Sequence, residues 1–483
     1  MFSKQNIKDA FGVDEIAITP LMLQKQELYR QIMSGHAPWN DKDTPSLMLA
    51  SVVVNETTDE ALNDFETEVV GTGAGRTNPR AEFLNEQYLA FVDNRLEEMV
   101  VNFLSEGETI LRPYMTVEGV DVNVYATDFY APLAYDTRGN LTDVVFVATS
   151  QPVGKTVYKL FERHTWNEEA QTNAITYRAF KSDRMNIASF GAENNGTPVA
   201  LTEVPEWAHL ADFTMGNMPK PLFVHVRNKT KLRLESPQRQ GLPMYAKAVE
   251  SGALEKLDKQ ESRTDWEFEG GELAVHANID AFRPGGGKKG EAQRPLELPK
   301  GKKRLYRTVD LDGIGMDVFS PTLRVAEHGE RLNQLRRDVE LQSGMSYGII
   351  SNNNQQDKTA TEFKASKKRL INTVMQTQRI AGVAIDALLA SWDKLLDIHG
   401  GVNIPPGEYE VIKQWNESLA LDREQEFAER AQAQTLGWVA QHQNLAWYQE
   451  IEDEDVAMQM LANIQKEREG SMVDDLLRRG EEA

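Results

Sequence analysis

Residues 357–399 read DKTATEFKASKKRLINTVMQTQRIAGVAIDALLASWDKLLDIH, and this stretch predicts one helix of about forty residues. Thr359 and Glu362 fit a capping box, in which each side chain accepts a free backbone N–H of the other residue. Gly400 and Gly401 follow at the other end, and glycine readily takes the left-handed conformation that ends a helix. At 1.5 Å per residue the helix would be roughly 60 Å long. Gly382, near its middle, is a candidate for a kink.

One largely apolar stripe runs along this helix. Its members recur at alternating steps of three and four residues: Ile371, Val374, Gln378, Ala381, Ile385, Leu388, Trp392 and Leu395. Helices of globular proteins average about 11–12 residues, so a helix of this length suggests a strut in a large assembly.

Composition limits the classes of protein to which the chain can belong. Its 483 residues include no cysteine, which excludes disulfides and thiolate metal sites. No apolar run approaches the roughly 20 residues of a membrane helix, and the first residues lack the apolar core of a signal peptide. We therefore expect no membrane span, and folding in a cytoplasm.

Charge is strongly acidic but uneven. The formal net charge is −21, so the chain as a whole repels phosphate and tight DNA binding is not its default behaviour. Between Arg283 and Arg307, however, lysine and arginine greatly outnumber acidic residues. This basic patch is either a solvated loop or a surface for a protein partner or DNA.

The first half of the chain divides into a helical part and a β-rich part. Residues 1–107 predict helices that begin at Thr44-Pro45 and Asn78-Pro79. The second helix has an apolar face, formed by Leu84, Tyr88, Phe91, Leu96, Met99 and Phe103. Residues 110–235 contain short β-type runs, and 156–164 faces 174–180 across a polar connection, which predicts a hairpin.

The second half alternates helices with small inserts. A helix is expected from Pro243 to about Phe268, ended by Gly270-Gly271, and another from near Thr322 to Gly344. Strand-like fragments lie between them. A polar loop precedes the long helix, Tyr409–Trp415 predicts a strand, and 422–469 predicts two or three amphipathic helices.

Motifs for catalysis are incomplete. Val153-Gly154-Lys155-Thr156 ends like a phosphate-binding loop, but Thr149 stands where that loop needs glycine and a β-type run follows. Asp310-Leu-Asp312-Gly predicts a turn rather than a calcium loop. The eight histidines show no zinc-site spacing. We therefore expect no enzymatic activity, cofactor or metal.

Short motifs recur where the predicted elements meet. The most specific is Lys358-Thr-Ala-Thr-Glu362, at a loop-to-helix junction. The others are Leu111-Arg-Pro-Tyr114, Asp128-Phe-Tyr-Ala-Pro132, Val318-Phe-Ser-Pro-Thr-Leu-Arg324, Ser343-Gly-Met-Ser-Tyr-Gly348, Tyr409-Glu-Val, Trp415 and Asp422-Arg-Glu424. With the element order, they resemble the portal proteins of tailed bacteriophages, especially the branch of long-tailed phages of Gram-positive hosts.

The resemblance spans almost the whole chain and implies a mainly helical α+β portal fold with a β-rich wing and a small α/β clip. Twelve subunits would form a ring around a central channel. In that ring a neighbouring copy would cover the apolar stripe of the long helix, which one chain would not bury alone. The implied regions are a wing (1–240, with a strand in 402–420), stem helices (241–271 and 322–345), a clip (272–321), a tunnel loop (346–358), a long kinked helix (359–401) and crown helices (421–483).

The resemblance also implies sites and partners. The tunnel loop would face double-stranded DNA through Asn352, Asn353, Asn354, Gln355, Gln356, Asp357 and Lys358. The clip would dock partners through Arg283, Lys288, Lys289, Lys300, Lys302, Lys303 and Arg304. Those partners would be the terminase large subunit and a head-completion (adaptor) protein, with the major capsid and scaffolding proteins around the ring, in a virion assembled in the host cytoplasm.

Two other functions stay open at this point. The chain could be a virion or scaffold structural protein without a channel. It could also be a nucleotide-dependent DNA-handling enzyme that uses Lys155. The polar run 352–358 could likewise be a plain linker.

Overall fold

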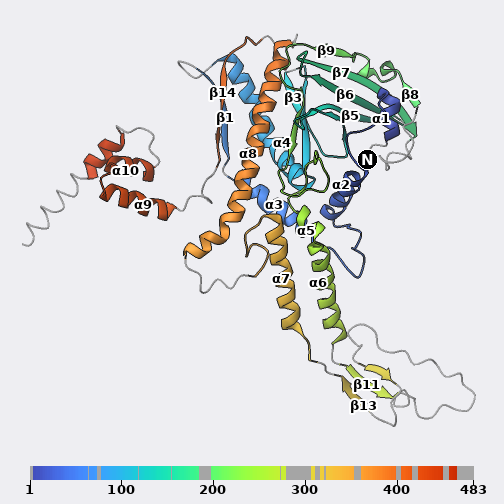
Figure 1. Cartoon of the computed structure of the whole chain (residues 1–483), viewed down its shortest axis with the longest axis vertical. Coiled ribbons are helices and arrows are strands. Elements are labelled where there is room, and N and C mark those ends of the chain that lie inside the picture. Colours follow the sequence, from blue (N-terminus) through green and yellow to red (C-terminus); the bar gives the residue numbers. More distant parts are fainter. Residues whose placement is uncertain are drawn as a thin grey trace, which may run out of the picture. The chain divides into compact units, whose positions relative to one another are not determined.

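The chain is an α+β protein that divides into two compact units, Met1–Trp415 and Asn416–Ala483 (Figure 1). The computed structural model describes residues 4–63, 65–72, 78–117, 119–153, 155–183, 197–271, 274–278, 306–309, 316–319, 322–352, 360–398, 404–415, 423–449 and 456–464. None of the helices in these ranges is long and apolar enough to cross a membrane.

Four helices and one strand form the N-terminal part of the first unit. They are α1 (Lys4–Phe11), α2 (Pro20–Met33), α3 (Leu49–Leu62), β1 (Glu66–Gly71) and α4 (Pro79–Ser105). The predicted cap at Asn78 is confirmed, because its side chain accepts the Ala81 N–H at 2.8 Å. The predicted start at Thr44 is wrong, since α3 begins at Leu49. The Thr-Pro pair that starts a helix is Thr19-Pro20, where the Thr19 hydroxyl accepts the Met22 N–H.

Two sheets follow, in the orders β10-β2-β3 and β4-β5-β6-β7-β8, with β9 paired to β7. Their strands are β2 (Glu108–Met115), β3 (Val120–Tyr125), β4 (Tyr130–Tyr135), β5 (Leu141–Val153), β6 (Thr156–Asn167), β7 (Thr172–Asp183), β8 (Thr197–Val199), β9 (Phe213–Met215) and β10 (Val224–Arg227). The predicted hairpin is confirmed, because β6 and β7 pair antiparallel with His164 opposite Ile175.

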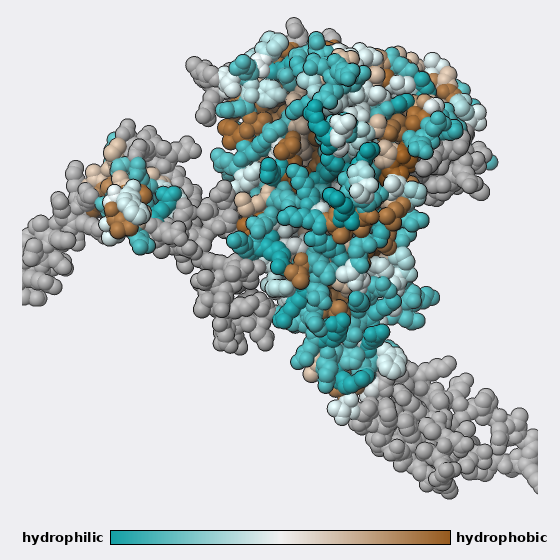
Figure 2. Space-filling model, viewed as in Figure 1, coloured by the Kyte–Doolittle hydropathy of each residue, from teal (hydrophilic) through white to brown (hydrophobic). Residues whose placement is uncertain are grey.

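An antiparallel helix pair comes next (Figure 1). The single helix predicted from Pro243 is in fact two, α5 (Ala246–Glu250) and α6 (Ala253–Gly270), because Gly252 between them has a φ of +70°. The second helix of the pair, α7 (Val325–Ser343), ends at Gly344 as predicted. Gln260 of α6 contacts His328 of α7. Nearer the C-terminal end of α6, Glu267 pairs with Arg324, which directly precedes α7. In Figure 2 this pair is mostly hydrophilic, whereas apolar patches gather over the body.

A small sheet lies between α6 and α7 in the sequence. Its strands are β11 (Ala274–Asn278), β12 (Tyr306–Val309) and β13 (Met316–Phe319). The central β11 pairs parallel with β12 and antiparallel with β13. The predicted strand-like fragments of this insert are therefore confirmed for these thirteen positions.

The predicted long helix is α8 (Ala360–Ile398), which has 39 residues. Its apolar stripe is buried within the chain, except for the half-buried Ile371. The helix contacts α3, α4 and the sheet β10-β2-β3. Trp392 packs edge-on against Phe91 of α4 and donates to the Asp121 carbonyl of β3 at 3.0 Å. The expectation that a neighbouring copy covers this stripe is therefore wrong, because the chain covers it itself.

After α8 the chain returns to its N-terminal part. The predicted strand β14 (Tyr409–Gln414) pairs antiparallel with β1, and Trp415 stacks on Phe65 at 4.0 Å between ring centroids. Lys413 of this strand pairs with Asp386 and donates to the Gly382 carbonyl at 3.3 Å. The kink at Gly382 stays a prediction.

The second unit contains α9 (Arg423–Thr435), α10 (Gln441–Gln449) and a further helix at 456–464, so the predicted helices are confirmed. Arg430 lies over the Trp447 ring at 4.7 Å. Several large apolar side chains of this unit are exposed, among them Leu436, Trp438 and Tyr448.

Candidate functional site at the base of the α7–α8 loop

The structure describes only part of the predicted site. Asn352 is described and exposed, whereas 353–359, and with them Thr359, lie outside the described residues. All seven predicted basic residues of the insert also lie outside them. Glu362 belongs to α8, but its side chain is outside the description. The base of the loop, residues 344–352, lies within the described residues.

A buried carboxylate organises this base. Glu340 of α7 is fully buried, and its Oε1 accepts backbone N–H groups of Gly348, Ile350 and Ser351 at 3.1, 2.7 and 2.9 Å. Its Oε2 accepts the Ser351 hydroxyl at 2.7 Å. A charged acceptor makes stronger hydrogen bonds than a neutral one, so segment 348–351 is wrapped tightly around one side chain.

Two asparagines fix the point at which the loop leaves α7. The Asn333 side chain accepts the Asn352 N–H at 2.7 Å and donates to the Asn352 carbonyl at 3.2 Å. Arg337 donates to the same carbonyl at 3.4 Å. Asn352 is thus held through its backbone, and its own side chain takes no part in these three bonds.

The other side of the base is tied to α8. The Thr373 hydroxyl donates to the Gly344 carbonyl at 2.9 Å, and the Leu370 N–H donates to the Ser346 hydroxyl oxygen at 3.2 Å. Gly344 has a φ of +80°, and a Cβ there would lie 2.7 Å from the Thr373 hydroxyl oxygen. Glycine is required here both for its backbone conformation and for this close approach.

Sequence reasoning missed Glu340, Asn333 and Thr373. An acidic residue in a polar helix normally faces solvent. The one available signal was the neighbouring run Ser343–Gly348, whose small residues permit the backbone to pass close to another group.

The Lys155 alternative meets a different geometry. Lys155 lies in the turn of the β5–β6 hairpin, where Val153 pairs with Thr156, and no helix follows it. A phosphate-binding loop of the Walker type needs a helix N-terminus directly after the lysine. Among the described residues, no group of three or more histidines and carboxylates could hold a metal ion.

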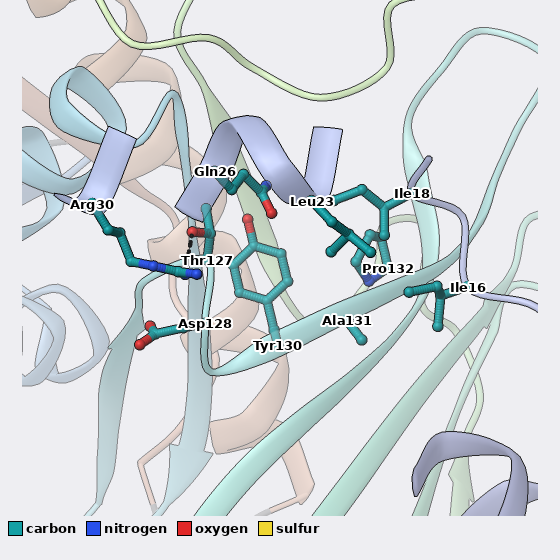
Figure 3. A pocket seen from close by; sticks show the side chains of 10 residues that line it. All are labelled: Ile16, Ile18, Leu23, Gln26, Arg30, Thr127, Asp128, Tyr130, Ala131 and Pro132. Atoms are coloured by element: carbon teal, nitrogen blue, oxygen red, sulfur yellow. Dashed lines mark hydrogen bonds between the residues drawn. The ribbon is translucent and has the colours of Figure 1, made fainter. Parts of the chain in front are cut away.

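A small cavity lies between α2 and β4, lined by Tyr130, Gln26 and apolar side chains (Figure 3). Its volume is about 20 Å³, which is room for about one water molecule. Arg30 reaches across one end to the Thr127 hydroxyl at 3.5 Å. This cavity is a packing void rather than a ligand site.

Two buried ionic clusters hold the β-rich part together. Arg112 of β2 pairs with Glu162 of β6, which also contacts His164 at 2.5 Å. Burial raises the pKa of Glu162, but the positive charge of Arg112 and the bond to His164 outweigh it and hold the pKa below 4.5. Glu108 shows the same balance, with His225 and the Gly241 N–H as its partners. Both clusters lie inside the fold and serve its stability.

Neither a protein-family model nor a curated protein sequence matches this chain. A functional assignment therefore rests on the residues and on the geometry of the fold.

Proposed function

We propose that the chain is the portal protein of a tailed bacteriophage. In this proposal twelve copies form a ring at one capsid vertex, and DNA enters and leaves through its channel. The ring is not an enzyme: ATP hydrolysis belongs to the terminase that docks on it, and a head-completion protein later replaces the terminase. The observation that supports this most is the order of the elements around α8.

That order matches what the sequence resemblance implies for a portal. The antiparallel pair α6–α7 would be the stem, and the three-stranded sheet between them in sequence would belong to the clip. The base around Glu340 follows α7, and α8 follows the loop. The chain then returns through β14 to pair with β1, before a separate helical unit that would be the crown.

The rigid loop base supports a role for segment 353–358 in the channel. Side chains that stay beside a sliding polymer need a fixed attachment, because a loop free at both ends would be carried along with the polymer. Glu340 and Asn333 supply that attachment on the α7 side. The segment itself is rich in neutral amides, which contact phosphates weakly. Together with a net charge of −21, this favours a channel in which DNA slides.

Negative-stain electron microscopy of the purified chain tests the proposal. We expect end views with a central hole and rotational symmetry. Particles without a hole would favour the virion or scaffold protein that has no channel. The enzyme alternative is tested with trinitrophenyl-ATP, since saturable binding that is lost in Lys155→Ala would contradict a non-enzymatic ring.

A further inference from the structure

α8 carries a second stripe of residues on a side that is not part of the core. The stripe recurs at steps of four, four, three and four, and consists of Arg379, Val383, Ala387, Ala390 and Lys394. Arg379 and Val383 are exposed, Val383 to 64%, and the other three are half-buried. The stripe is apolar with small side chains in its middle and basic at both ends.

This stripe lines a groove of about 760 Å³ between α8 and β10. Ala387 and Ala390 form part of its apolar lining, together with Met218 and Pro221. Six of the residues that line it are basic: Arg138, Lys220, Arg227, Lys229, Arg379 and Lys394. Its two acidic lining residues, Glu168 and Asp393, already have arginine partners, Arg138 and Arg80. The groove is therefore basic around an apolar lining, in a chain whose net charge is −21.

α4 carries a stripe with the opposite charge. Its members, Glu82, Glu86, Leu89, Asp93 and Glu97, recur at steps of four, three, four and four and are all exposed. Leu89 is 38% exposed and lies in the middle, with two carboxylates on each side. Both stripes span sixteen residues of helix, or about 22 Å from the first Cα to the last.

We propose that the α8 groove of one copy binds the α4 stripe of a second copy. Leu89 packs on the small side chains of Val383, Ala387 and Ala390, and the carboxylates at its two ends meet the basic rim. This inference rests on the proposed function, because it supplies the contact between neighbours in the ring. The sequence resemblance implies that the apolar stripe of α8 makes this contact, but the chain buries that stripe itself. The α4 stripe and the α8 groove take its place in the proposed contact.

The contact is heterologous, which suits a ring. Two different surfaces meet, so each added copy presents an unused α4 stripe at one side and an unused α8 groove at the other. Such a contact repeats until the rotation closes the ring, or it continues as an open filament. A two-fold dimer would instead satisfy both surfaces at once and stop.

Disulfide cross-linking tests the contact cleanly, because the chain has no cysteine of its own. The double variant Leu89→Cys, Val383→Cys should give a ladder of covalent multimers on oxidation. An equal mixture of the two single variants should give covalent dimers only, since each cross-link uses one cysteine of each kind. The pair Leu21→Cys, Val383→Cys is the matched control, because Leu21 is similarly exposed on α2, and it should give no ladder.

Charge reversal provides a second test of the contact. Arg379→Glu with Lys394→Glu should reduce the cross-linked fraction at least tenfold, and adding Glu86→Lys with Asp93→Lys should restore most of it. Rings in micrographs without an 89–383 cross-link would overturn the contact and leave the portal proposal standing. Cross-linked filaments without rings would support the contact and contradict the portal. Binding of a 20-base-pair DNA at 0.15 M salt that is lost in the charge-reversed variant, without cross-linking, would overturn the contact in favour of a nucleic-acid groove.

Discussion

Glu340 is one residue on which the geometry of the loop base depends. Replacing it by alanine leaves three backbone N–H groups and one hydroxyl without their acceptor in a buried place. We expect Glu340→Ala to lower the free energy of unfolding by about 2 to 3 kcal/mol, as for other buried donors left unsatisfied. Urea denaturation measures this loss, and amide exchange should show reduced protection at Gly348, Ile350 and Ser351.

Glu330→Ala is the matched control, because Glu330 lies on the same helix and is exposed. It should change the free energy of unfolding by less than about 0.5 kcal/mol. Equal effects of the two substitutions, or unchanged exchange at 348–351 in Glu340→Ala, would show that the carboxylate does not hold the loop base.

The lowered pKa of Glu162 leads us to expect a specific dependence of stability on pH. Its pKa in the folded chain lies below the ordinary value of 4.5, so the unfolded chain binds the proton first as the pH falls. The stabilisation is complete above about pH 4.5 and is lost as the pH falls through the folded pKa. Urea midpoints of wild type and Glu162→Gln between pH 7 and pH 3 should therefore converge toward the acid end.

At pH 7 the Glu162→Gln variant should be less stable than wild type by about 3 kcal/mol, because Arg112 stays buried without its partner. Glu168→Gln, at the exposed end of the same hairpin, should follow the wild-type pH curve. A constant gap between Glu162→Gln and wild type at every pH would contradict this account.

Several single residues were predictable because their role is local. Asn78 caps α4 and Gly344 ends α7 through bonds within a few residues, and the sequence contains both partners. Glu340 was not predictable, since its partners at 348–351 depend on how the chain turns back over α7. Thr44 was mistaken for a cap because Thr-Pro pairs also occur in loops, and Thr19-Pro20 has the same signature.

One buried arginine links the start of α4 to the end of α8. Arg80 at the start of α4 is 1% exposed and pairs with Asp393 and Asp397 near the end of α8. We expect Arg80→Met to lower the free energy of unfolding by about 2 to 3 kcal/mol, below the range for fully buried pairs because both carboxylates are partly exposed. Thermal denaturation and a double-mutant cycle with Asp393→Asn measure this.

Arg95→Met supplies the comparison, because Arg95 is on the same helix but makes only an exposed pair with Glu98. Its effect should stay below about 1 kcal/mol. If Arg80→Met lowers the free energy of unfolding no more than Arg95→Met does, the ion pairs of Arg80 do not hold the end of α8 in place.

We predict that the loop between α7 and α8 can be removed without disturbing its base. Deleting 353–358 retains Asn352, which the Asn333 side chain binds, so the fold and ring assembly should persist. We expect normal rings in micrographs but reduced DNA packaging or retention in a complementation assay. A shortened chain that no longer forms rings would argue against a purely channel-facing role.

At the level of elements, periodicity predicted which side of each helix is apolar but not what covers it. The stripe of α8 was identified correctly, yet its cover comes from α3, α4 and β2 of the same chain. Strand β1 was missed, because its partner β14 lies more than three hundred residues away. The break at Gly252 was missed because a single glycine is often tolerated within a helix.

For the whole molecule, the burial of that stripe changes which surfaces can carry assembly. In the proposed ring, neighbouring copies meet through the exposed stripes of α4 and α8, which have opposite charges, rather than through an apolar seam. Association should therefore weaken with salt, since exposed charges are screened over about 8 Å at physiological ionic strength. Sedimentation in 0.05 M and 1 M sodium chloride should show fewer assembled copies at the higher concentration, whereas an apolar seam would give the opposite trend.

The central claim is that twelve copies close into a ring. Native mass spectrometry of the purified chain at low salt tests it most directly, because the mass counts the subunits. We predict a main species with twelve times the 54.5 kDa mass of one chain. A single species at 54.5 kDa across concentrations and salt conditions would contradict the account.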